Sequence, residues 1–454
     1  MTSPFDAATS DIGDQGEPPR MLGRPPGPAS LEAVRRLERV ECPAFGERRA
    51  QRSKASEADM TPIVLASGKG SNIEDVDGNR YVDLVAGFGS VLLGHGAAAI
   101  ARAVEDQGAR LIQALGDVYS ADAKVRLLEE LAALHPGEAP KVLLSQSGSD
   151  AITAAIKTAA LATSRPGIVA FEGSYHGLGY APLPACGLRE SYRAPFAEQL
   201  NPHVAFTPYP GRAEDLDPAL DALAKALRKG DVGAVLVEPI LGRGGCLVPP
   251  DGFLRGVCEV AHRSGALVIA DEVWTGLGRS GSMVRSLEVG APVDILCFGK
   301  GLGGGLPISA CLAPDAIMGA WARGGEVVHT STHAGLPLAC AAALATLSEL
   351  RAKDYPARAR AVGARAKRVF EGEVGGRPGV VDIRGEGLMI GIELESGALA
   401  LRVSRGMLER GYMVLTGGTR GEVLTLTPAL PIPEGLLAGA AAALRESLAG
   451  GSAW

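Results

Sequence analysis

The chain has 454 residues, 46% of them hydrophobic and 21% charged, with a net charge of −6 at neutral pH. This length allows a sizeable core and predicts roughly two to three domains or subdomains. The acidic balance, without a basic run, gives no reason to expect nucleic acid or an anionic membrane as a partner. The seven cysteines are odd in number, far apart and without a C-x-x-C pair, which argues against disulfides and zinc and favours a reduced, cytoplasmic setting.

Residues 1–30 are rich in proline and glycine and contain early acidic residues. A signal peptide would instead begin with positive charge and continue with an apolar stretch, so we expect a disordered arm here. No apolar run reaches the roughly 18 to 20 residues that span a bilayer, and we therefore expect a soluble protein. Residues 31–90 follow as the N-terminal part of a small domain, with short strands and a turn at 77–79.

Residues 91–345 form the predicted large domain, where short apolar runs alternate with helical patterns. The patterns in chain order are KVLLS, DAITAAIKTAALATS, GIVAFEG, PALDALAKALRKG, GAVLVEP, FLRGVCEVAHRSG, ALVIADE and DILCFG. Such alternation predicts an α/β domain whose sheet is mostly parallel and covered on both faces. Ligands bind outside the carboxyl ends of such strands. This rule selects Ser147 to Asp150, Tyr175, Glu238, Asp271 and Lys300.

Residues 346–454 have a different pattern, in which a long helix from about Asp354 precedes two strand-like runs, a helix near 399–410, two more strand-like runs and a closing helix. We expect this segment to form the C-terminal part of the small domain. The predicted architecture is therefore a large α/β domain with a smaller α+β domain built from both ends of the chain.

The stretch FGKGLGGGLPIS places Lys300 among five glycines after a buried strand. It is not a P-loop, because Gly301 stands where Ser or Thr is required, and a dinucleotide fingerprint would need a following helix for which no space remains. A surface turn that happens to contain lysine is one alternative. The other is a desolvated, nucleophilic amine, which Asp271 at the end of a neighbouring buried strand favours, because a buried acid needs a positive partner.

The segments ALVIADEVWTGLGRSG and DILCFGKGLGGGLPISA resemble the core of the class III, or omega, aminotransferases, which use pyridoxal phosphate. Further matching motifs are SGSDA, FEGSYHG, EPI-x-G-x-GG, TSTHAGLPLA and RGEGLMIGIEL, in family order between Asp75 and Pro428. The resemblance implies fold-type I and makes the large domain the one that binds pyridoxal phosphate.

The resemblance also implies roles for individual residues. Lys300 matches the Schiff-base lysine that holds the cofactor aldehyde and moves the proton, and Asp271 matches the acid that keeps the pyridine nitrogen protonated. The other implied cofactor contacts are Gly148, Ser149, Tyr175, His176, Glu238, Val273 and Thr332. Ordinary N-capping remains an alternative for the first two, and a buried aromatic for Tyr175. Thr332 matches a threonine that reaches the phosphate of the neighbouring subunit, which implies a homodimer with shared active sites.

His329 and His333 stand four positions apart, as a helical metal pair would. The intervening Thr-Ser-Thr is a poor helix former, and the segment coincides with the phosphate motif. We therefore expect no metal site.

The chain departs from ornithine-type members of the family at the substrate pocket. Where those members have an acid and a late arginine that pair with each other, this chain has Arg243 and Thr425, and Leu241 and Trp274 replace two glutamines. One possibility is that Arg243 anchors a substrate carboxylate from the opposite wall, since a guanidinium can form two hydrogen bonds to a carboxylate. The other is that Arg243 points to solvent and the pocket accepts an amine without a nearby carboxylate. Phe88 and Trp274 suggest a more apolar pocket.

We therefore expect an aminotransferase that works by a ping-pong mechanism. Its substrates would be an amino acid or amine donor and a keto acid or aldehyde acceptor. A racemase, epimerase or aminomutase on the same fold is the alternative, since fold does not determine reaction. A non-catalytic binding module is disfavoured because both Lys300 and Asp271 are present.

Overall fold

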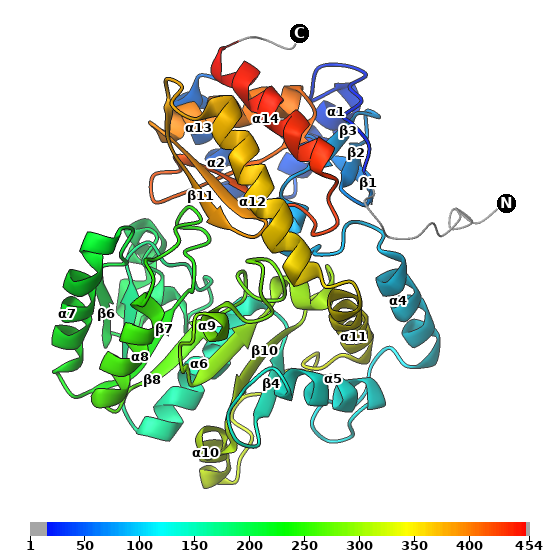
Figure 1. Ribbon diagram of the computed structural model, residues 1–454. Helices are drawn as coiled ribbons and strands as arrows, with labels where there is room; N and C mark the ends of the chain where they lie inside the picture. Colours follow the sequence, from blue (N-terminus) through cyan, green and yellow to red (C-terminus); the bar gives the residue numbers. More distant parts are fainter. Residues whose placement is uncertain (1–15, 451–454) are drawn as a thin grey trace.

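The computed structural model describes residues 16–450. Figure 1 shows a large part built around a broad sheet and a smaller part in which the blue N-terminal and the orange and red C-terminal elements lie together. This is the predicted arrangement of a large α/β domain and a smaller domain built from both termini. In the part of the chain that is described, none of the helices combines the length and apolar character needed to cross a membrane.

The large domain contains a seven-stranded sheet in the order β4-β10-β9-β8-β7-β5-β6. The strands from β9 to β6 pair in parallel, and only β10 runs antiparallel, to β9 and to β4. The mostly parallel sheet is thus confirmed, and β6, which was missing from the predicted runs, extends its edge. The bounds are β4 (Lys141–Ser145), β5 (Gly167–Phe171), β6 (Val204–Thr207), β7 (Val232–Val237), β8 (Leu267–Asp271), β9 (Ile295–Phe298) and β10 (Ser309–Ala313).

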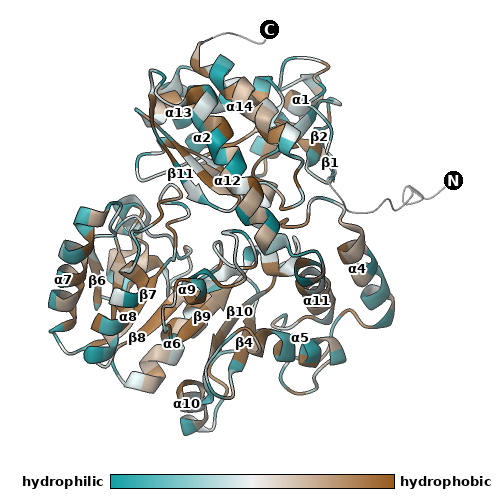
Figure 2. Cartoon of the chain, viewed as in Figure 1, coloured by the Kyte–Doolittle hydropathy of each residue, from teal (hydrophilic) through white to brown (hydrophobic). Residues whose placement is uncertain are grey.

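Helices cover both faces of this sheet. In β7, Val235 belongs to the core that contains Val257 of α8, whereas the next residue, Leu236, belongs to the core that contains Ile152 of α6. This alternation follows from the two-residue period of a strand. Figure 2 shows the brown, apolar strands between helices whose outer faces are teal. The bounds are α6 (Gly148–Thr163), α7 (Leu216–Leu227) and α8 (Phe253–Arg263).

A second group of helices packs beside β4 and the glycine-rich turn. In this group α11 contacts α4 and α5, and α5 contacts β4. The bounds are α4 (Ala98–Arg110), α5 (Asp122–Ala132) and α11 (Pro337–Ala352), with the single-turn helices α3 (Ala86–Gly89), α9 (Arg285–Glu288) and α10 (Asp315–Met318) elsewhere in the domain.

The small domain joins the two ends of the chain through a shared sheet. Strand β13 pairs in parallel with β3, with Tyr412 opposite Val82, in a sheet of the order β1-β2-β3-β13. A second, antiparallel sheet has the order β11-β12-β15-β14. The strands are β1 (Leu65–Lys69), β2 (Asn72–Asp75), β3 (Arg80–Asp83), β11 (Val380–Glu386), β12 (Met389–Leu394), β13 (Tyr412–Met413), β14 (Leu415–Gly417) and β15 (Val423–Leu426). The helices are α1 (Pro28–Glu38), α2 (Pro43–Ser56), α12 (Tyr355–Val374), α13 (Gly397–Glu409) and α14 (Glu434–Leu448).

Two details differ from the predicted domain organisation. Residues 1–15 of the expected arm lie outside the described residues, but Arg20 bridges to Arg80 and the Leu22 N–H donates to Asn79 Oδ1 at 2.7 Å. These hydrogen bonds tie residues 16–27 to the small domain, so the arm is ordered there. The predicted boundary at residue 345 falls inside α11, which packs on helices of the large domain.

Candidate functional site

The candidate site lies at the carboxyl edge of the large sheet, where strands that run in the same direction end together. Most of the site residues selected from the sequence follow the ends of β4, β5, β7, β8 and β9. They are Gly148 and Ser149, Tyr175 and His176, Glu238, Asp271 and Val273, and Lys300, in strand order. The contacts described below bring these residues together at one place, as the strand-end rule predicts.

Lys300 begins the short 3-10 helix η5 (Lys300–Gly303) between β9 and β10, so no long helix follows the glycines. Its backbone has φ = 39°, a left-handed conformation that a lysine rarely adopts and that is enriched at functional sites. The ammonium lies 4.6 Å from the ring centroid of Trp274. Burial lowers the pKa of Lys300 below its ordinary value, while Asp271 and Glu238 oppose this shift. A lowered pKa increases the fraction of neutral, nucleophilic amine.

Asp271 and His176 form a buried pair, with 2.7 Å between Asp271 Oδ2 and His176 Nδ1. The other oxygen, Oδ1, accepts the backbone N–H of Val273 at 3.1 Å. His176 Nε2 is buried and has no partner among the described residues. The imidazole orients a carboxylate that would otherwise be costly to bury, and the resulting acid suits a protonated pyridine nitrogen.

Glu238 is held from two directions by the backbone. It accepts the N–H of Tyr175 at 2.7 Å and the N–H of Gly242 at 2.9 Å. Burial raises the pKa of Glu238 to about 7, with His176 acting in the opposite direction and Asp271 adding to the shift. Glu238 therefore positions the loop that carries Tyr175 and the loop that leads to Arg243.

The start of α6 is a suitable place for a phosphate. Ser147 caps the helix by accepting the Asp150 N–H, so Gly148 and Ser149 occupy its first turn, where backbone N–H groups lack intrahelical partners. Gly148 is needed here, because a methyl group on it would lie 2.7 Å from Cγ1 of Val273. The side chain of Ser149 accepts the Gly179 N–H at 3.1 Å. The N-cap is Ser147, not Gly148 or Ser149, and the uncapped N–H groups beside it fit a dianion.

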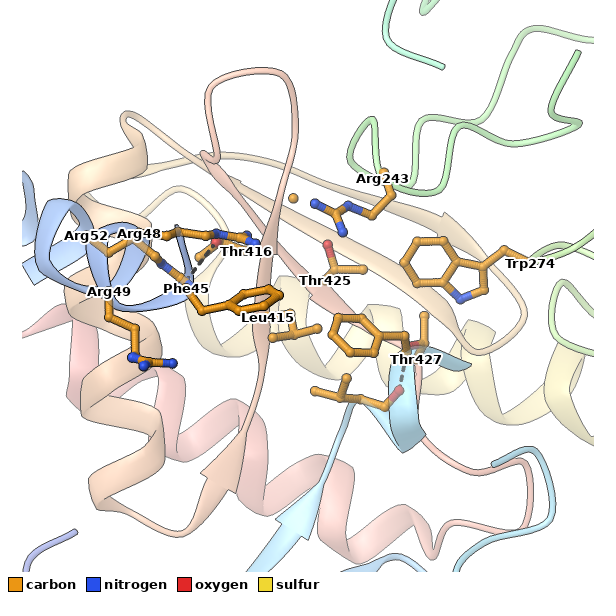
Figure 3. Close-up of a pocket in the computed structure, with 13 residues that line it drawn as sticks. Phe45, Arg48, Arg49, Arg52, Arg243, Trp274, Leu415, Thr416, Thr425 and Thr427 are labelled. Carbon is orange, nitrogen blue, oxygen red and sulfur yellow. Dashed lines mark hydrogen bonds between the residues drawn. The ribbon is translucent and has the colours of Figure 1, made fainter. Parts of the chain in front are cut away.

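A cavity of about 280 Å³ adjoins Lys300 through Trp274. Figure 3 shows its lining: Arg243 and Trp274 lie on one side, and α2 contributes arginines on the other. The Arg243 guanidinium carbon lies 5.1 Å from the ring centroid of Tyr175. Phe88 and Thr425 line the same cavity, so the substrate residues predicted from the sequence do meet in one place.

Two glycines that the sequence analysis did not select make room for Trp274. A methyl group on Gly89 would lie 2.5 Å from Trp274 Nε1, and one on Gly242 would lie 2.4 Å from Trp274 Cε3. The indole is therefore held between two segments that are far apart in the sequence. The same cavity is lined by Arg48 and Arg52 of α2, which were also missed because no motif marks them.

Thr332 contacts Gln113, a residue that is not among the predicted cofactor contacts. It is exposed in a turn, and Gln113 donates to its carbonyl oxygen at 2.8 Å. His329 and His333 belong to the same non-helical segment, and His333 Nδ1 is 3.1 Å from Gln113 Nε2. No group of three or more metal-ligating side chains occurs among residues 16–450.

Comparison with known proteins identifies the family. The model of the family described as aminotransferase class-III matches residues 53–448. An acetylornithine aminotransferase of Methanothermobacter thermautotrophicus is 36% identical over 371 residues, which cover 82% of this chain and 90% of that protein. The 5-aminovalerate aminotransferase DavT of Pseudomonas aeruginosa is 33% identical, with 85% and 93% covered.

A solved structure supports the same assignment. The amine transaminase from an uncultivated Pseudomonas species, in its PLP-bound form, superposes with a TM-score of 0.79 at 30% identity, covering 86% of this chain and 95% of that one. All three of these proteins are named aminotransferases or transaminases, which supports transamination over racemisation and over a non-catalytic role. The chain therefore belongs to the class III aminotransferases, fold-type I enzymes that depend on pyridoxal phosphate.

Proposed function

We propose that the chain transfers an amino group from a donor that carries a carboxylate to a keto acid or aldehyde, in two half-reactions at one site. The observation that carries this proposal is the placement of the Lys300 amine and the buried Asp271–His176 pair at the same edge of the sheet. A nucleophilic amine and an acid suited to a pyridine nitrogen are the two groups that this chemistry requires.

The residues present fit pyridoxal phosphate. The first turn of α6, with Gly148 and Ser149, would hold the phosphate, and Asp271 would hold the pyridine nitrogen in its protonated form. When bound, the cofactor supplies an electron sink for the substrate carbon. Nζ of Lys300 would hold the cofactor aldehyde and, after substrate displaces it, carry the proton between carbon atoms, for which a lowered pKa is favourable.

Arg243 is the proposed anchor for the donor carboxylate. Its side chain is partly exposed and lines the cavity beside Trp274, and Figure 3 shows its guanidinium and the Thr425 hydroxyl pointing toward each other. Of the described residues, no carboxylate pairs with Arg243, so its guanidinium group is available to a substrate carboxylate. The names of the relatives point the same way, since acetylornithine and 5-aminovalerate both carry a carboxylate and an amine.

The decisive experiment follows the absorption of the cofactor-loaded protein as single amino donors are added without an acceptor. Acidic ω-amino acids, α-amino acids of both hands, diamines and simple amines form the series. We expect the cofactor to pass from its aldehyde to its amine form with acidic donors. Exchange of the donor's α-proton without formation of the amine form would instead indicate a racemase or aminomutase.

We also propose a homodimer whose active sites are shared. Exposed apolar side chains gather in the segment 111–119 and in 327–328, and Gln113 links the first segment to Thr332. Clustered exposed apolar residues are typical of protein interfaces. In such a dimer, Thr332 would reach the phosphate at the α6 start of the partner subunit.

The proposed location is the cytoplasm. All seven cysteines are free, and every one except Cys42 is buried. Free buried thiols are typical of proteins from reducing compartments.

A further inference from the structure

A second cavity, of about 390 Å³, lies next to the first and is rich in arginine. The two cavities share the side chains of Arg48, Arg52 and Arg243 in their linings. Five arginines in all line the second cavity. They come from α2, from the segment between β5 and β6, from the loop after β7 and from the β14–β15 turn: Arg48, Arg52, Arg189, Arg243 and Arg420. These elements lie far apart in the sequence, so the positive cluster exists only in the folded chain.

The arginine cluster has little negative charge to balance it. Among the residues that the structure describes, no aspartate or glutamate lines either cavity. Arg52 reaches only the Thr416 hydroxyl, at 3.3 Å, and Arg189 donates to the Thr419 carbonyl oxygen at 3.1 Å. Arg420 alone has an acid nearby, Glu422 at 3.7 Å. Neutral acceptors therefore satisfy parts of these side chains and leave most of the charge uncompensated.

The cluster holds its charges close together. Burial lowers the pKa of Arg52, and the positive charges of Arg48, Arg189 and Arg243 lower it further. Like charges this close repel each other, and an anion between them removes that repulsion. Clustered charges of one sign in a cavity are a feature of functional sites, and here the sign favours an anion.

A helix end adds to the positive potential of the cavity. Gly397 and Ala398, the first two residues of the 13-residue helix α13, belong to its lining. The first turn of a helix presents unpaired N–H groups and the positive end of the helix dipole. Together with the arginines, this helix start favours an anion with several acceptor oxygens.

We propose that the arginine cluster binds a second anionic group of the substrate, at the end remote from Lys300. This inference rests on the proposed function, in which Arg243 anchors a first carboxylate. The substrate class is then an amino compound or keto acid with at least two negatively charged groups, the remote one a carboxylate or a phosphate. The first cavity connects the indole beside Lys300 with Arg48 and Arg52, so one extended molecule can span both sites.

The binding test uses the cofactor-loaded protein, whose own phosphate site is filled. Glutarate and inorganic phosphate are titrated calorimetrically into the wild type and into Arg52→Gln, Arg48→Gln and Lys54→Gln. Lys54 is exposed on the same helix and lines neither cavity, so it controls for the lost charge. Losing one charged hydrogen-bond donor should raise the Kd for the better anion by about tenfold or more, whereas Lys54→Gln should change it by less than about twofold.

Tighter binding of glutarate would indicate that the remote group of the substrate is a carboxylate, and tighter binding of phosphate would indicate that it is a phosphate. The inference is wrong if the wild type binds neither anion, or if both arginine variants bind as Lys54→Gln does. Circular dichroism and the melting temperature confirm that each variant is folded.

A kinetic comparison separates this inference from the proposed function. 2-Aminohexanoate, which carries only the carboxylate next to its amine, and 2-aminoadipate, which has a second carboxylate at the remote end, serve as paired donors. Arg52→Gln should raise KM for the donor with two charges by about tenfold while changing kcat/KM for the other donor little. Equal effects on both donors would overturn the second anion site, whereas absence of transamination with every donor of the earlier series would overturn the proposed function instead.

Discussion

At the scale of single residues, Arg243 and Thr425 illustrate how a joint substitution changes a pocket. An acid without its arginine would leave a buried charge unpaired, at a cost of about 3–5 kcal/mol. Here the late position holds a small threonine, buried with its hydroxyl unpartnered among the described residues, and the loop position holds an arginine. Both residues line one cavity. Compared with the ornithine-type pattern, the cavity therefore keeps an arginine, but on the opposite wall.

Replacing Arg243 with alanine tests this role. We expect KM for acidic amino donors to rise by about tenfold to a hundredfold, because a charged, forked hydrogen bond to the carboxylate is lost. Cofactor uptake should remain, since Arg243 contacts the outer face of the site through Tyr175. Arg243→Lys keeps the positive charge but cannot form two parallel hydrogen bonds. Its KM for acidic donors should therefore lie between those of the wild type and of Arg243→Ala. Steady-state kinetics with acidic and simple amine donors give the answer, and unchanged values for acidic donors would exclude Arg243 as the anchor.

At the scale of secondary structure elements, the first turn of α6 shows why its first helical residue must be glycine. Gly148 lies against Val273 of the loop after β8, and no side chain fits between them. The helix itself is otherwise strongly favoured, since alanines such as Ala151 and Ala155 pack against the sheet and stabilise the helical backbone. Close approach of helix and strand end is what brings the phosphate site to Asp271.

Gly148→Ala should therefore weaken cofactor binding without unfolding the protein. The added methyl group would lie 2.7 Å from Val273 Cγ1, and relieving such overpacking costs about 1–3 kcal/mol. We expect the Kd for pyridoxal phosphate to rise by about tenfold or more, measured by titration of the apoprotein. The control is Gly372→Ala, in α12 with open space around it, which should raise stability by about 0.5–1 kcal/mol and leave the Kd unchanged.

At the scale of the whole molecule, the position of Thr332 bears on assembly. Within one chain this residue is exposed, and Gln113 donates a hydrogen bond to its carbonyl oxygen. Exposed apolar side chains such as Ile112 and Val327 lie in the two segments that flank it. A second copy of the chain that covers this face would bring its threonine to a phosphate site.

Mixing two variants, assayed at a cofactor concentration at which neither is active alone, tests the shared site. Thr332→Ala should lower cofactor affinity, and Lys300→Ala should abolish covalent attachment. If the threonine acts across the interface, each hybrid dimer contains one site with Lys300 from one subunit and Thr332 from the other, so activity should return on mixing. Separate refolding of each variant alone is the control. Activity that stays absent after mixing, although hybrid dimers form, would show that Thr332 serves its own subunit or neither.

Much of the fold, and the meeting of the candidate site residues at one edge of the sheet, could be predicted because both follow local patterns. Buried strands and amphipathic helices have their own periods, and candidate residues such as Glu238 and Lys300 directly follow apolar runs. The short edge strand β6 was missed because its four residues carry no clear period. The order in the N-terminal segment was missed because hydrogen bonds such as that from Leu22 to Asn79 depend on a distant turn.

The family follows from the amino-acid sequence, as do the candidates for the nucleophile and its acid partner, since motifs of contiguous residues determine them. The substrate side does not, because its walls come from segments that meet only when the chain is packed. Gly89 and Gly242 enclose Trp274, and Arg52 of α2 approaches Arg243 across the domain boundary. Side-chain direction and contact between distant segments depend on packing, which no local period encodes. Arginines from four separate segments of the chain therefore form one concentrated anion site in the folded protein.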